Sequence, residues 1–333
     1  MKKKLLMVLV FTCILLSGCG KETEQSILKK LKEKVEDTQA YQVTGDLCIY
    51  SNEDEYAYEV TVSYQKENQF RVLLKNKTNN HEQIILRNED GVYVLTPSLN
   101  KSFKFQSDWP YNSSQSYILQ PLLEDMENEE EREFKKTDDG YEWITKVNYV
   151  SNTKLVNQKI VLDKNLNFKT VEVYDETGAV SISMKFDKID YKAKFDDHYF
   201  DLNNNMEVAR ENVDTDEEVS NMDDIIYPMY IPKNTSLESQ DKVEKEVGER
   251  VILTFAGESP FVFIQETSPV CEEMSVLPVD GEPILLASGI GALTDSSITW
   301  IEDNIEYYIT TTDLTEEEML EVVNSVSVMP IGK

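Results

Sequence analysis

The sequence predicts a mainly β protein of the α+β class, in which a curved antiparallel sheet with helices at its mouth precedes a small α+β domain. Three observations predict it. Apolar residues alternate with polar ones through about ten short runs between residues 41 and 202, with turn residues between the runs. The short connections favour antiparallel pairing in chain order. One face of the sheet is apolar and aromatic, so the sheet must curl over that face or be covered by helices.

The N-terminus predicts export and lipid attachment. Lys2 to Lys4 form a basic segment, and residues 5–16 form an apolar run shorter than the roughly 20 residues that span a bilayer. We therefore expect residues 1–18 to be a signal peptide. The run ends in Ser17-Gly18-Cys19, which resembles the bacterial lipobox and implies cleavage before Cys19 and a diacylglycerol on its thiol. Residues 19–25 would then be a lipidated tether; an ordinary signal peptide with a chance cysteine is the alternative.

Residues 26–202 are expected to form the first domain. It opens with a helix over residues 26–38, whose apolar residues recur at helical spacing on one face. A second helical stripe at residues 113–126 interrupts the strands, with Pro121 near a break or in a first turn. The predicted strands are Tyr41–Ile49, Tyr56–Tyr64, Phe70–Leu74, Ile84–Leu86, Val92–Val94, Phe103–Phe105, Tyr141–Tyr149, Val156–Leu162, Phe168–Val173 and Val180–Phe186.

Residues 203–224 are polar and acidic, and we expect them to be a linker. Residues 225–333 are expected to form the small α+β domain. Its last helix is the clearest local prediction, because Thr315 and Glu318 fit a capping box. The strands expected before it are Ile225–Ile231, Val251–Phe255, Phe261–Gln265, Ile284–Ala287 and Glu306–Thr311.

Charge and motifs exclude several functions. The 333 residues carry a formal net charge of −29, which argues against nucleic-acid binding. The 2 histidines, His81 and His198, lie beside turn or acidic residues, and the chain has neither a Gly-x-Ser-x-Gly turn nor a His-Glu-x-x-His motif. We therefore predict no catalytic residues, no metal site and no cofactor. A carboxylate pair for glycoside hydrolysis stays open, because its geometry is invisible in a sequence.

Two cysteines, Cys48 and Cys271, remain once Cys13 leaves with the signal peptide and Cys19 is acylated. An extracytoplasmic location permits disulfides. Three states stay open: a bridge between the two cysteines, a pair of buried free thiols, or an intermolecular bridge through an exposed thiol.

Aromatic residues on the strand faces are candidates for the lining of a hydrophobic cavity. The same rings could form a filled core instead, since apolar residues at a period of two usually do. A second aromatic feature, Trp109-Pro110, lies between a strand and a helix and is either an exposed docking element or a buried plug. The candidate lining residues are Tyr56, Tyr58, Tyr64, Phe70, Phe103, Phe105 and Trp143.

The segment from residue 24 to residue 202 resembles the LolA-like lipoprotein-carrier fold and, within it, the YdcC-like and GerS-like sporulation and germination lipoproteins of Gram-positive spore formers. The resemblance implies an unclosed antiparallel β-barrel capped by helices, with a cavity that shields acyl chains in the carriers. The last hundred or so residues resemble a small domain of unknown function in other envelope lipoproteins. The residues that carry the resemblance are Tyr41–Gly45, Gln69–Val72, Ile84, Gly91–Pro97, Phe103–Pro110 and Gln115–Tyr117, and for the last domain Ile231-Pro232, Gly291–Leu293 and Trp300–Tyr308.

The expected function is that of a membrane-anchored, non-enzymatic binding or scaffold protein in sporulation or germination. Its own lipobox would fix it to the cell membrane, with the outer forespore membrane as one location, so it would not shuttle as the soluble carriers do. The resemblance implies a cortex-processing enzyme as its protein partner. The alternative is a lipid or lipoprotein carrier with an acyl-chain ligand, and the third possibility is a hydrolase with paired acids.

Overall fold

The computed structural model describes residues 22–51, 54–128, 131–149, 152–211, 222, 225–302 and 304–328. The predicted signal peptide at residues 1–18, Cys19 and the first half of the predicted tether lie outside these residues. Within the part of the chain that is described, no helix has both the length and the apolar character needed to cross a membrane.

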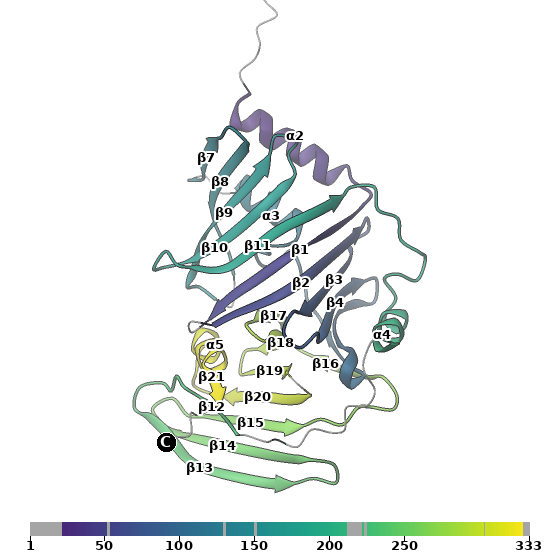
Figure 1. The fold of residues 1–333 in the computed structure, drawn as a ribbon. Coiled ribbons are helices and arrows are strands. Elements are labelled where there is room, and N and C mark those ends of the chain that lie inside the picture. The colour runs from purple at the N-terminus through teal and green to yellow at the C-terminus, as the bar shows by residue number, and fades with distance from the viewer. Residues whose placement is uncertain are drawn as a thin grey trace, which may run out of the picture.

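A 12-stranded sheet forms the larger part of the fold, in the order β16-β6-β5-β4-β3-β2-β1-β11-β10-β9-β8-β7 (Figure 1). Its neighbouring strands are antiparallel except for β16, which pairs in parallel with β6. Because β16 and β7 are the two edges, the sheet is unclosed, and the predicted fold class is confirmed. The strands are β1 (Ala40–Ser51), β2 (Asp54–Gln65), β3 (Gln69–Asn76), β4 (Glu82–Asn88), β5 (Gly91–Thr96), β6 (Lys101–Phe105), β7 (Glu133–Lys136), β8 (Gly140–Lys146), β9 (Leu155–Asp163), β10 (Phe168–Asp175), β11 (Val180–Asp190) and β16 (Ser275–Val279).

Two helices, α2 (Glu24–Glu36) and α3 (Leu119–Asn128), pack on the apolar face of this sheet. Their inward side chains share one core with the strands, and Leu31 and Leu122 are both 0% exposed. Helix α2 begins slightly earlier than predicted, because Thr23 caps it by accepting a hydrogen bond from the backbone N–H of Ser26. Helix α3 is shorter than its predicted stripe, because its Pro121 is tolerated only in a first turn.

Part of the predicted linker is helical. Helix α4 (Leu202–Glu211) packs Met206 and Ala209 against Ile84 and Leu86, which are on the opposite face of the first sheet from α2 and α3. The linker prediction is therefore wrong for residues 203–211. The pattern was missed because few apolar residues mark the helix, and much of its attachment is polar.

The second unit, residues 225–328, contains a seven-stranded antiparallel sheet in the order β13-β14-β15-β20-β19-β18-β17 and a short pair, β12 with β21. Helix α5 (Glu316–Asn324) has the predicted capping box, in which Thr315 and Glu318 bond each other's backbone N–H. The strands are β12 (Ile226–Pro228), β13 (Thr235–Glu244), β14 (Glu249–Gly257), β15 (Phe261–Thr267), β17 (Glu282–Leu286), β18 (Gly289–Thr294), β19 (Ser297–Glu302), β20 (Ile305–Thr311) and β21 (Val326–Val328).

The two units are more intimately joined than the predicted division implies. Strand β16 belongs to the second unit by sequence but forms an edge of the first sheet. Ala287 and Ile290 lie in the same core cluster as the first sheet. Lys101 of β6 places its Nζ 2.7 Å from Oε2 of Glu306 on β20, and this carboxylate is 2% exposed. The second unit is thus fixed at the end of the first sheet that lies opposite α2, as Figure 1 shows.

Candidate ligand cavity

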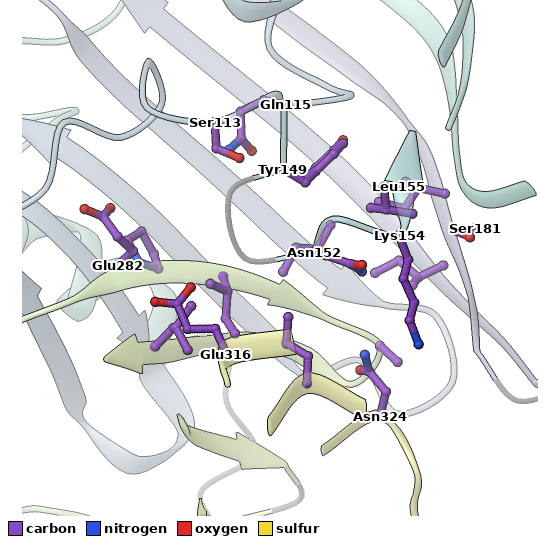
Figure 2. Close-up of a pocket in the computed structure, with 18 of the residues that line it drawn as sticks. Ser113, Gln115, Tyr149, Asn152, Lys154, Leu155, Ser181, Glu282, Glu316 and Asn324 are labelled. Carbon is purple, nitrogen blue, oxygen red and sulfur yellow. The ribbon is translucent and has the colours of Figure 1, made fainter. Parts of the chain in front are cut away.

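A cavity of about 550 Å³ lies where the second unit meets the first sheet. Both units line it, and Figure 2 shows part of its wall. Its volume is in the range of pockets that hold small molecules. It therefore provides a candidate functional site that depends on both units.

The first sheet and the loop that follows β6 supply most of the apolar wall. Ile49 on β1 and Ile182 on β11 are 8% and 7% exposed, and Leu155 begins β9 beside them in the lining. Trp109 and Tyr117 come from the loop between β6 and α3, and both are 2% exposed. Because these side chains are packed on their other sides, they offer a firm, partly aromatic surface.

Strand β17 and helix α5 form the opposite wall. Ile284 and Leu320 add apolar surface, whereas Glu282 and Glu316 add carboxylates. In Figure 2 these two glutamates are on one side of the pocket, with Ser113, Gln115 and Tyr149 on another side and Lys154 near Asn324. Glu316 is in the first turn of α5, where the helix dipole favours a negative charge.

Glu282 is held in place by the loop of the first unit. Asn112 donates a hydrogen bond from Nδ2 to Oε2 of Glu282 over 2.7 Å, and the hydroxyl of Ser107 donates to the same oxygen. That hydroxyl also accepts a bond of 2.9 Å from the backbone N–H of Trp109. One network thus fixes both the carboxylate and the indole. Both bonds use Oε2, so the other oxygen of the carboxylate, Oε1, is left for another donor.

Contacts on either side of the cavity attach its two walls. Tyr58 on β2 donates a buried hydrogen bond of 2.7 Å to the backbone oxygen of Ala287. Burial raises the pKa of the Tyr58 hydroxyl, so it stays a neutral donor. Lys154 forms an ion pair with Glu321 of α5. These contacts hold the second unit in register over the ends of β1 and β11.

The lining carries an excess of negative charge. Among the described lining residues the only cation is Lys154, which Glu321 already pairs. Asp175 is partly used by its own turn, where it accepts bonds from backbone N–H groups, and these bonds together with the Thr177 hydroxyl lower its pKa. The carboxylates of the lining are Asp175, Glu282, Asp295 and Glu316.

The seven aromatic residues proposed as cavity lining do not line this cavity, which corrects that expectation. Six are buried and Tyr56 is partly buried, all in or against the core of the first sheet. Their rings pack on one another and on their neighbours: Tyr64 and Phe70 have centroids 4.9 Å apart, and Trp143 is 4.7 Å from Phe134. Helices α2 and α3, together with Ala287 and Ile290 of the second unit, share this core with the rings. Of the two alternatives left open by the sequence, the filled core therefore describes these residues.

Trp109 is a buried plug and not an exposed docking element. Its ring meets Phe70 edge to face, with centroids 6.1 Å apart. Arg87 donates a hydrogen bond to its backbone oxygen. Trp109 thus packs as part of the filled core and also contributes to the wall of the cavity.

Cys48 and Cys271 are both free, partly exposed thiols in this structure. Cys48 is on β1, where desolvation raises the pKa of its thiol and makes it less reactive. Cys271 precedes β16, and its backbone N–H donates to the oxygen of Leu99. Of the states left open by the sequence, the structure therefore has free thiols, although only partly buried ones.

Other candidate chemistry is sparse. In the described part of the chain no group of three His, Cys, Asp or Glu residues could hold a metal ion. His198 is exposed and 2.6 Å from Asp201, which raises its pKa. Asp125 of α3 is partly buried: desolvation raises its pKa to about 6, while Ser114 and Gln158 donate hydrogen bonds to it.

Sequence reasoning missed the residues that define the cavity. Glu282 is one of 62 acids and has no motif around it, and its partner Asn112 is 170 positions away. Trp109 and Tyr117 were noted in the sequence, but only the structure brings them to Glu282. The contacts that create this site are long-range, so no local signal could have revealed it.

Comparison with known proteins places the chain near sporulation proteins. A family model described as "Sporulation protein YdcC-like" matches residues 1–200. The sporulation protein YdcC of Bacillus subtilis (strain 168) is 35% identical over 322 residues, which are 96% of this chain and 95% of that protein.

Solved structures with similar folds are more distant. The MucA/MucB complex of Pseudomonas aeruginosa matches with 11% identity, 91% and 97% coverage of the two chains and a TM-score of 0.31. A LolA superfamily protein from Nitrosomonas europaea is 12% identical, with coverage of 54% of this chain and 97% of that chain and a TM-score of 0.29. A chain in the complex of the CwlD amidase with the GerS lipoprotein from Clostridioides difficile is 13% identical, with coverage of 53% of this chain and 98% of that chain and a TM-score of 0.23. At these TM-scores the likenesses carry no argument about partners.

Proposed function

Because the chain belongs to the YdcC-like sporulation protein family, we propose that it is a lipid-anchored protein that binds a partner during sporulation and catalyses no reaction. The observation that carries this proposal is the cavity between the two units. It is a built site with a positioned carboxylate and an aromatic wall, and its described lining residues include neither His nor Cys. Such a site is suited to recognition.

The anchor is proposed to be diacylglycerol on Cys19. Helix α2 begins at Glu24, only five residues after that cysteine, so its end of the molecule would lie near the membrane. The second unit is at the other end of the molecule (Figure 1). The full chain has a net charge of −29, and cleavage before Cys19 would also remove Lys2 to Lys4, so the anchored protein would be repelled by anionic lipid. Two acyl chains supply enough apolar burial to hold it there. The second unit and its cavity would then face away from the membrane.

A cortex-processing enzyme is the partner class that we propose, following the resemblance of residues 24–202 to sporulation and germination lipoproteins. An acyl-chain carrier is less well supported, because rings and helices fill the interior of the first sheet and carboxylates line the remaining cavity. The filled interior therefore favours protein binding over lipid transport.

Metabolic labelling with a clickable palmitate tests the anchor. We expect the wild-type chain and the matched cysteine variant Cys271→Ser to be labelled in sporulating cells, and Cys19→Ala to remain unlabelled. Label on Cys19→Ala would contradict lipid attachment at this residue.

Affinity capture from crosslinked sporulating cells tests the binding role. We expect a cell-envelope protein to be captured in a fixed ratio to the bait, and extracted lipid to stay at the level of a mock capture. A stoichiometric lipid without a protein would instead support the carrier function and contradict the proposal.

A further inference from the structure

The cavity between the two units is electrostatically unbalanced in a way that suits one class of ligand. Its carboxylates outnumber its cation, and Glu321 already neutralises that cation, Lys154. In the described part of the chain neither Glu282 nor Glu316 forms an ion pair with a Lys or Arg. A positive ligand would therefore meet charges that the fold leaves uncompensated.

One oxygen of the Glu282 carboxylate lacks a donor at the edge of the cavity. The Nδ2 atom of Asn112 and the hydroxyl of Ser107 both donate to Oε2, which fixes the orientation of the carboxylate. In the described part of the chain, neither of these bonds uses Oε1. This oxygen is therefore left to accept a charge-assisted hydrogen bond from a ligand that carries N–H groups.

The rest of the lining suits an aliphatic chain. Ile49, Leu155 and Ile182 form an apolar strip from the first sheet, and the rings of Trp109 and Tyr117 lie in the same wall. Aromatic faces attract ammonium groups as well as methylene groups. Glu282 and Glu316 come from the wall opposite this strip, so a ligand with a charged end and an apolar body satisfies both.

We propose that this cavity binds an organic cation, an ammonium group carried on an aliphatic chain. The ammonium donates to Oε1 of Glu282, Glu316 adds a second negative charge, and the methylene chain covers the strip from Ile49 to Ile182. Such a group occurs in lysine side chains of a partner peptide and in free polyamines. The binding of this cation rests on the proposed function and specifies what its site recognises.

The same lining rejects acyl chains with anionic ends. A fatty-acid carboxylate or a phosphate would face Glu282 and Glu316 without a free cation to offset the repulsion. The cavity therefore differs in ligand class from a site that shields lipids.

Calorimetric titration of the full-length chain in a non-ionic detergent tests the proposal. The probes are spermine, a tetralysine peptide and, as the anionic counterpart, decanoate, all in about 150 mM salt so that diffuse surface attraction is screened. We expect saturable binding of at least one cation with one site and no binding of decanoate. Tighter binding of tetralysine would identify a peptide side chain as the source, and tighter binding of spermine a free polyamine.

Charge-removing variants locate the binding. Glu282→Gln keeps an acceptor for Asn112 and Ser107, so the loop stays held, and Glu316→Gln keeps the size of its side chain. We expect each to weaken cation binding at least fivefold. Glu273→Gln removes the same charge from an exposed position outside the cavity and should leave binding unchanged.

Three outcomes would overturn the proposal: equal weakening by Glu273→Gln, which would indicate only general surface charge; saturable binding of decanoate; or no saturable binding of either cation. None of these would affect palmitate labelling at Cys19 or capture of a protein partner. Failure of the cation site and failure of the proposed function are therefore distinguishable.

Discussion

Strand β1 connects two regions of the molecule that differ in how the same apolar face is covered. Near its start, Tyr41 and Val43 are 0% exposed beneath α2 and α3. Near its end, Ile49 is on the same face and is 8% exposed in the cavity wall. In Figure 1 the strand passes from the α2 end of the sheet to the neighbourhood of α5.

The difference teaches that the covering element decides whether this face becomes core or site. The helices bring stripes of Leu and Met that interdigitate with the rings of the sheet and leave no room for a ligand. The second unit approaches with β17 and the first turn of α5, which carry glutamates. At this end the two walls stay apart, and the cavity of about 550 Å³ lies between them.

The largest expected effect comes from detaching the cover of the cavity. Lys101→Met leaves the carboxylate of Glu306 buried without its cation, and we expect a loss of about 3–5 kcal/mol in the free energy of unfolding. Urea unfolding measures it. As a control, Lys29→Met removes an exposed pair with an N–O distance of 3.8 Å and should leave the stability unchanged within error. Equal effects would mean that the buried pair does not hold the cover.

A matched pair of isoleucines compares the filled and hollow regions directly. Ile160 is 0% exposed in the filled core, and Ile160→Ala should cost about 2–5 kcal/mol because a new cavity forms. Ile49→Ala should cost less, about 1–2 kcal/mol, because one side of Ile49 already faces open space. Urea unfolding of both variants at one pH gives the difference. If both cost the same, the cavity end would be as tightly packed as the helix-covered end.

The partly buried Asp125 at the helix-covered end predicts a pH dependence. Burial raises the pKa of Asp125 from 3.8 to about 6, so the folded state holds this proton more tightly than the unfolded chain does. The resulting stabilisation, roughly 2–3 kcal/mol, is complete below pH 4 and is lost as the pH rises to about 6. The stability of the wild type relative to Asp125→Asn should therefore fall over this range, as measured by urea unfolding at several pH values.

A second acid provides the control with the opposite sign. Hydrogen bonds within its turn lower the pKa of Asp175, so its stabilisation is present at neutral pH and is lost as the pH falls through the folded-state pKa. The wild type should lose stability relative to Asp175→Asn on acidification. A flat difference for Asp125→Asn, or the same sign for both variants, would rule out the assignment.

The smallest effect is expected from filling the cavity. Ala287 is on its lining, so Ala287→Leu should change the free energy of unfolding by less than about 1 kcal/mol. Ala209 is packed between α4 and the first sheet, and Ala209→Leu should cost about 1–3 kcal/mol through overpacking. Thermal unfolding can rank the two. Equal destabilisation would indicate that the space beside Ala287 is not accessible to a side chain.

Features encoded by neighbouring residues were predictable from the sequence. The capping box of Thr315 and Glu318, the stripe of α2 and the alternation of the strands all follow from spacing of a few residues. The filled core was one of two stated alternatives for the aromatic residues, because alternation shows which face is apolar and not what covers it.

Features made by distant segments were not predictable. Strand β16 was not expected, since it is short, contains Pro278 and pairs with β6 more than 170 positions earlier. Proline is acceptable there because β16 is an edge strand. The carboxylate of Glu282 acquires its role only when Ser107 and Asn112 bond it from the first unit. Cys48 and Cys271 gave no pairing signal, and each is free in the fold.

The edge position of β16 has a consequence for biosynthesis. The ribosome delivers β6 long before Ser275–Val279, so β6 has an unpaired edge of backbone donors and acceptors until β16 is translated and covers it. Unpaired strand edges are templates for strand pairing between molecules, which leads to aggregation. A chain truncated after residue 202 would lack β16 and leave the edge of β6 unpaired, so we expect it to form inclusion bodies. The first domain is therefore not expected to be produced in soluble form without the second, although the sequence suggests two separate domains.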